Sequence, residues 1–144
     1  MKRFVLAVSM AALLAGCGLR TRVRPPEDTA PVIPGAVTAV RDGDAVVVRW
    51  KRAEKSADGM TVNDLAAFVV ERRREGEQPW QAVTTVDVVD QEKIRHRSDF
   101  SWRDADAGSG AVSYRVIAVC ADGQHGPPTE GVAATDAPEH LTPP

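Results

Sequence analysis

The sequence has few of the residues that carry covalent or metal chemistry. Its 144 residues include two cysteines, one tyrosine and three histidines. The histidines fall in separate segments that we expect to be loops or tail, so no zinc site is predicted at His96, His125 or His140. Ser109 lies between two glycines, but the helix of a nucleophile elbow is not expected after it. With no nucleophile beside a base, we expect a protein that is not an enzyme and uses no metal or cofactor.

A calcium-binding loop is also incomplete. Residues 104–108 have aspartates at alternate positions and end in glycine, which is typical of the start of such a loop. The twelfth position, where a bidentate glutamate is needed, is Arg115. We therefore interpret residues 104–108 as a solvated turn.

Neither sign of charge is in large excess. The formal net charge is −2, and removal of Lys2 and Arg3 by the processing described below would bring it to about −4. A mildly acidic chain does not fit a nucleic acid partner, because phosphate backbones are bound by clusters of Lys and Arg. With 43% hydrophobic and 26% charged residues, the composition is that of a globular domain.

No apolar run is long enough to span a bilayer. The apolar run over residues 4–14 is well short of the ~20 residues that a spanning helix needs. It follows two cations and is followed by two small residues, which is the layout of a secretory signal. Together with Cys17, residues 14–16 resemble the lipobox of bacterial lipoproteins. The resemblance implies cleavage after Gly16 and a lipid on Cys17, which would anchor the chain in a membrane. The alternative is an ordinary signal peptide with a chance cysteine.

Lipid attachment would leave Cys120 as the only other cysteine, so no internal disulfide could form. We interpret Cys120 as a small buried apolar residue, and the alternative is a bridge to another molecule. The expected organisation is a signal peptide over 1–16, a lipidated cysteine and flexible Pro-rich linker over 17–34, one domain over 35–136 and a disordered tail over 137–144.

From about residue 36 onward, apolar residues recur at every second position between turn signals. This pattern predicts strands with one buried face. The expected strands lie near 37–39, 46–51, 68–73, 80–89, 100–104, 112–120 and 130–135. Seven short strands without a helical period indicate an all-β chain folded as a seven-stranded antiparallel β-sandwich. The inward phase carries the expected core aromatics Trp50, Phe68, Trp102 and Tyr114.

Several segments resemble the fibronectin type III domain, an immunoglobulin-like sandwich, in the right order. They are Pro34-Gly35-Ala36-Val37-Thr38-Ala39, Trp50, Phe68-Val69-Val70-Glu71-Arg72, and Tyr114-Arg115-Val116-Ile117-Ala118-Val119 followed by Gly123, Gly126 and Pro127-Pro128. The resemblance covers about residues 32 to 136, and it implies that the third and sixth strands are neighbours. The family's tyrosine-corner position falls on Val112. Tyr114 is then the next inward residue, and the corner hydrogen bond is not expected.

Three apolar residues have the outward phase, Val69 on the third strand and Ile117 and Val119 on the sixth. On neighbouring strands they would form an apolar strip on an outer sheet face, and such patches mark contact surfaces. The alternative is ordinary scattered exposure of aliphatic residues. Antiparallel pairing also predicts that loops 53–64 and 122–128 lie at the same end as the start of the domain, where they form a second candidate surface.

These features predict a lipoprotein of the bacterial cell envelope that presents a non-catalytic module to an envelope protein or a glycan. Gly18 after the cysteine favours the outer membrane under the enteric sorting rule. One alternative is a structural accessory or assembly subunit of an envelope complex, docked through Val69, Ile117 and Val119. The other alternative is a carbohydrate-processing protein, because type III domains accompany secreted glycosidases.

Overall fold

The computed structural model describes residues 34–56, 58–89 and 98–137. These residues form seven strands and no helix. The strands are β1 (Thr38–Asp42), β2 (Ala45–Lys51), β3 (Leu65–Arg74), β4 (Gln81–Asp87), β5 (Asp99–Asp104), β6 (Val112–Cys120) and β7 (Val132–Ala133). The signal peptide, Cys17, most of the linker and most of the tail lie outside the described residues.

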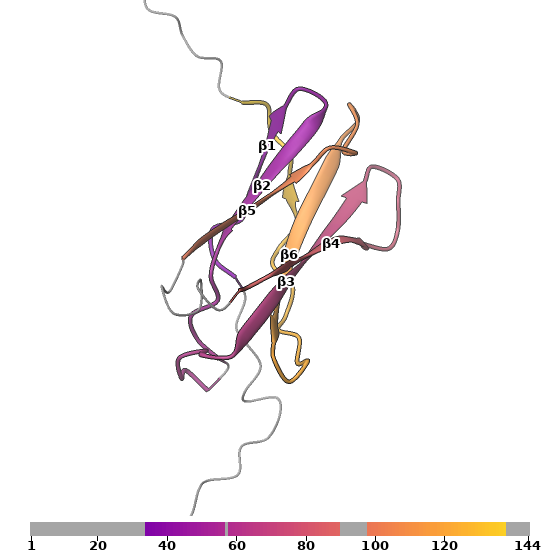
Figure 1. The fold of residues 1–144 in the computed structure, drawn as a ribbon. Coiled ribbons are helices and arrows are strands. Elements are labelled where there is room, and N and C mark those ends of the chain that lie inside the picture. The colour runs from indigo at the N-terminus through magenta and orange to yellow at the C-terminus, as the bar shows by residue number, and fades with distance from the viewer. Residues whose placement is uncertain (1–33, 57, 90–97, 138–144) are drawn as a thin grey trace, which may run out of the picture.

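The strands form two antiparallel sheets that pack face to face (Figure 1). The three-stranded sheet has the order β1-β2-β5, and the four-stranded sheet has the order β4-β3-β6-β7. The predicted seven-stranded antiparallel sandwich is confirmed, as is the pairing of the third strand with the sixth. The hairpin turn between β1 and β2 requires a positive φ, which Gly43 provides at 63°.

The seventh strand differs from its prediction over 130–135 because the chain changes sheets within that segment. Val132 and Ala133 pair with β6, whereas Thr135 bonds to β1 on the other sheet. The Thr135 amide donates to the Ala39 carbonyl at 3.0 Å, and the Thr135 carbonyl accepts from the Arg41 amide at 2.8 Å. The continuous alternation over residues 130–135 therefore covers two short segments, one on each sheet.

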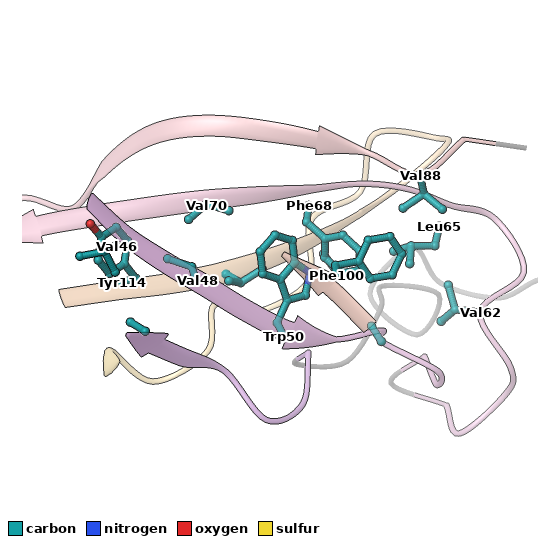
Figure 2. Close-up of a cluster of buried hydrophobic side chains, with 14 of the residues drawn as sticks. Val46, Val48, Trp50, Val62, Leu65, Phe68, Val70, Val88, Phe100 and Tyr114 are labelled. Carbon is teal, nitrogen blue, oxygen red and sulfur yellow. The ribbon is translucent and has the colours of Figure 1, made fainter. Parts of the chain in front are cut away.

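Alternating side chains from both sheets fill the core (Figure 2). The Trp50 ring lies edge-on to Phe68, with centroids 5.5 Å apart, and stacks on Phe100 at 6.2 Å. Trp50, Phe68 and Tyr114 are buried as predicted, and such aromatic groups each contribute about 2 to 3 kcal/mol of hydrophobic stabilisation. Trp102, also predicted in the core, is only partly buried because β5 is an edge strand.

The two ends of the sandwich carry different loops. At the N-terminal end, the Gly35 carbonyl accepts from the Lys51 amide at 2.8 Å, and the Asp64 carbonyl accepts from the Ala121 amide at 2.8 Å. These bonds confirm that the start of the domain lies beside the β2–β3 and β6–β7 loops. The far end carries the β1–β2, β3–β4 and β5–β6 turns (Figure 1).

Candidate functional site

The predicted apolar strip lies on the outer face of the four-stranded sheet. Val69 is directly opposite Ile117 in the β3–β6 register, and Val119 follows opposite Ala67. Val69, Ile117 and Val119 are each half-buried rather than fully exposed. The strip is therefore continuous across two central strands, although less of it is exposed than the alternation alone suggested.

An aromatic and cationic cluster continues the same face toward the far end. Trp80 precedes β4, and the Cζ atoms of Arg73 and Arg115 lie 4.5 Å and 4.8 Å from the centroid of its ring. Both distances are within the range of cation–π attraction. The Arg115 Nε atom also pairs with the Glu71 carboxylate at 2.5 Å. Glu71 stands opposite Arg115, one row beyond Val69 and Ile117.

Trp80 is held against the outer face by the backbone that leads into β7. A Cβ atom at Gly131 would lie 2.8 Å from Cη2 and Cζ2 of the Trp80 ring. Cβ atoms essentially never lie that close to another heavy atom, so the ring can occupy this position, which we call its seat, only because Gly131 has no side chain. A cavity of about 440 Å³ adjoins this cluster at Arg73 and Ser113, under the β3–β4 turn.

We call Val69, Ile117, Val119, Trp80, Arg73 and Arg115 together the outer-face surface. Strand alternation predicts its three aliphatic residues but not Trp80, Arg73 or Arg115. A tryptophan directly after a Gly-containing turn was the available signal, but strand alternation does not say that Trp80 leaves the strand to lie across the face. Tryptophan and arginine are enriched in the energetic centres of protein interfaces.

Three polar side chains, Arg72, Asp104 and Tyr114, form a buried hydrogen-bonded cluster at the far end of the sandwich, and we call this cluster the latch. Asp104 is 2% exposed, and its Oδ2 atom accepts from Arg72 Nη1 at 2.7 Å and from the Tyr114 hydroxyl at 2.7 Å. Its Oδ1 atom accepts from the Asp106 amide at 3.1 Å. The interpretation of residues 104–108 as a solvated turn is therefore wrong for Asp104, because the carboxylate has three donors to satisfy it. Burial, with the neighbouring Asp104 carboxylate, raises the pKa of Tyr114.

The Tyr114 hydroxyl bonds to the Asp104 side chain, which bears on the expectation about the tyrosine corner. Tyr114 is the inward residue after Val112, as predicted, and its hydroxyl donates to a side chain ten residues upstream. The latch joins β5 of one sheet to β3 and β6 of the other. Its geometry supports a structural role rather than a catalytic one, because all three partners are already engaged with one another.

Cys120 lies at the N-terminal end and is 3% exposed. It forms no disulfide within the described residues. Ligand atoms of Asp64, Cys120 and Asp122 lie within 4.8 Å of one another. Burial first, and then the adjacent Asp64, raise the pKa of the Cys120 thiol from 9.0 to about 12. Asp64 and Asp122 are exposed, and exposed carboxylates beside one cysteine do not by themselves support a metal assignment.

Cys17, the predicted lipidation site, lies outside the described residues, and so does His96. Among the residues that the structure describes, no helix is long and apolar enough to cross a membrane. His125 is exposed and forms an isolated bridge with Val119. His125 thus lies at the end of the apolar strip without contributing to any group of metal-ligating side chains found among the described residues.

No protein-family model matches the chain, and no curated protein matches it either. Solved structures do. The chain is similar to the third fibronectin III domain of human KIAA0343 protein, with 12% identity over 88% of this chain and 98% of that one and a TM-score of 0.51. It is similar to part of a family 76 glycoside hydrolase from a bovine Bacteroides thetaiotaomicron strain, with 9% identity over 72% of this chain and a TM-score of 0.53.

A third similar structure is the titin kinase with its flanking domains, with 17% identity over 71% of this chain and a TM-score of 0.46. The chain spans only 17% of that structure and 20% of the glycoside hydrolase. The matched region is 20% of the glycoside hydrolase and 98% of the human fibronectin III domain, and identities this low show the fold alone. The described residues of this chain have the fold of a fibronectin type III domain.

Proposed function

We propose that the protein is a lipoprotein of the bacterial envelope, anchored through Cys17, whose fibronectin-type domain is a non-catalytic module that binds another envelope protein. The outer-face surface is the observation that carries this proposal. It combines an apolar strip on β3 and β6 with Trp80 and two arginine side chains, which is the composition of an interface centre with a polar border.

A protein partner fits this surface better than a glycan does. Sugars stack on the open face of an aromatic ring, whereas the Trp80 ring already has two guanidinium groups within 5 Å of its centroid. The half-buried valines and isoleucine offer apolar area that a protein side chain can cover. The rival protein-binding site is the pair of loops 53–64 and 122–128 at the N-terminal end.

The test is site-specific photo-cross-linking in cells that make the full chain. A photoreactive residue at position 117 should give one defined adduct, and the same residue at position 47 should give none. Val47 is a matched control because it is a half-buried outward aliphatic on β2, the central strand of the other sheet. An equal adduct from position 47, or from loop position 124 alone, would contradict the assignment to the outer-face surface.

Charge substitution supplies the second half of the test. Val69→Lys should abolish the adduct because it places an ammonium group opposite Ile117, whereas Val47→Lys should leave it intact. Cys17→Ser should move the protein from the membrane fraction to the soluble fraction and remove labelling by a fatty acid. Retention in the membrane without labelling would contradict lipid anchoring through this residue.

A further inference from the structure

Arg52 is a buried charged residue that forms no ion pair with the described residues. It follows β2 directly, two positions after the inward-facing Trp50, and is 8% exposed. Its backbone amide donates to the Ser98 carbonyl at 2.7 Å. Its Nη1 atom is buried without a hydrogen-bond partner, and none of the ion pairs among the described residues involves it.

A buried guanidinium nitrogen without an acceptor is unfavourable, because burial removes the hydrogen bond that water would give to this charged group. Arg72 at the far end does have acceptors, since its guanidinium donates to both the Asp104 carboxylate and the Asp106 carbonyl. Trp50 Nε1 also lacks a partner, but its ring is enclosed by Phe68 and Phe100. Of these two donors, only Arg52 carries a charge, and it lines a cavity of the β2–β3 loop.

The cavity lies in the β2–β3 loop and has a volume of about 180 Å³. Its lining residues are Arg52, Glu54, Lys55, Thr61 and Val62. Described residues of the loop bond to one another: the Val62 amide donates to the Glu54 carbonyl at 3.0 Å, and Lys55 forms an isolated antiparallel β-bridge with Thr61. The site therefore offers a guanidinium, an ammonium and a hydroxyl, with one exposed carboxylate at Glu54.

We propose that this cavity binds a phosphate group. Phosphate supplies several acceptor oxygens to a guanidinium fork and to further donors at once, which one neutral acceptor cannot do. The two cations exceed the single carboxylate, so the local charge favours an anion. Glu54 opposes it, so Glu54→Gln should tighten binding.

The phosphate can come from solution or from a lipid head group. Lys51, the residue before Arg52, is hydrogen-bonded to Gly35 at the start of the domain. A membrane anchor on the segment before residue 34 would therefore attach at the end that carries this cavity. Phosphate in solution would need no such anchor.

The test measures thermal unfolding of the full chain, reconstituted in galactolipid vesicles that contain no phosphate. Added inorganic phosphate should raise the unfolding temperature saturably, against sodium chloride at equal ionic strength, because a ligand of the folded state stabilises it. Arg52→Met should remove this response or weaken apparent affinity by about tenfold or more. Arg49→Met should keep the response. Arg49 is a matched control because it is an exposed arginine on β2 that does not line this cavity.

The same variants in phosphatidylglycerol vesicles identify the source. A wild-type advantage over Arg52→Met that appears in phosphatidylglycerol without any response to inorganic phosphate identifies a lipid head group. In galactolipid vesicles without phosphate, Arg52→Met should unfold at or above the wild-type temperature, because it removes an unpaired buried charge.

Two results would overturn the proposal. One is the absence of any Arg52-dependent response to phosphate or to phosphatidylglycerol. The other is strong destabilisation by Arg52→Met in phosphate-free vesicles. That loss would show that another part of the chain already supplies a carboxylate to the guanidinium.

Discussion

Replacing Asp104 with alanine should destabilise the protein more than any other single change at the far end. The substitution removes the acceptor of three donors, the Arg72 guanidinium, the Tyr114 hydroxyl and the Asp106 amide. The Arg72 side chain is only 12% exposed, so water cannot fully replace the lost carboxylate. Breaking a buried pair by removing one partner costs about 3 to 5 kcal/mol.

Substitution of Tyr114, or of Arg72 and Asp104 together, should lower the free energy of unfolding by less than Asp104→Ala does. Tyr114→Phe removes one hydrogen bond to a charged acceptor, worth about 1.5 kcal/mol at the lower end for such bonds, because Asp104 keeps Arg72. Changing Arg72 and Asp104 together to Met and Leu should cost less than Asp104→Ala alone, since no uncompensated charge remains. Against a total stability of about 5 to 15 kcal/mol, Asp104→Ala takes a large share.

Urea unfolding followed by tryptophan fluorescence measures these differences. Asp106→Ala is the matched control, because the bonds that involve Asp106 use its backbone amide and carbonyl. It should change the free energy of unfolding by no more than about 0.5 kcal/mol. Equal and small losses for the Asp104 and Asp106 variants would refute the assignment of the latch as a buried charge network.

Two further predictions concern Trp80 and Cys120. Gly131→Ala should displace the Trp80 ring, seen as a change in its fluorescence and loss of its close contacts to Arg73 and Arg115 protons in NMR spectra, with the domain still folded; an unchanged ring environment would contradict the seat at Gly131. Cys120 should resist a maleimide at neutral pH in the folded protein. Because the folded state holds the thiol proton up to about pH 12 and the unfolded state loses it from about pH 9, stability should fall between these values by at most about 1.4 kcal/mol per pH unit. Cys120→Ala should remove that slope.

The sandwich could be predicted because a strand with one buried face has a period of two. That period was clear in β2 and β6, where every second residue is buried, as in Val46, Val48 and Trp50. The same period gave a wrong strand assignment where one segment bonds to strands of both sheets. Residues 130–135 alternate like one strand, but Val132 bonds to β6 and Thr135 to β1. Alternation records which side of the chain is buried and not which strand lies beside it.

The outer-face surface shows the same limit for sites. The outward phase of Val69 and Ile117 was readable, and their direct opposition followed from the expected neighbourhood of the two strands. Alternation predicts that Trp80 is a strand residue, but its observed position depends on contacts with two strands and on the missing side chain of Gly131, some 50 residues away. The cation–π contacts with Arg73 and Arg115 could not be inferred from spacing alone.

The two inward-facing arginines show what alternation leaves undecided. Arg72 continues the inward phase of Phe68 and Val70, and Arg52 continues that of Val48 and Trp50. Both are thereby directed toward the interior, where a charge requires a partner. Arg72 pairs with a carboxylate 32 residues away, whereas Nη1 of Arg52 has no hydrogen-bond partner in the described chain. The same local pattern thus produces a structural latch at one end of the core and an unsatisfied cation at the other. We therefore expect the two arginine-to-methionine variants to differ in sign: loss of the Arg72 charge strands Asp104 and destabilises the fold, while loss of the Arg52 charge does not.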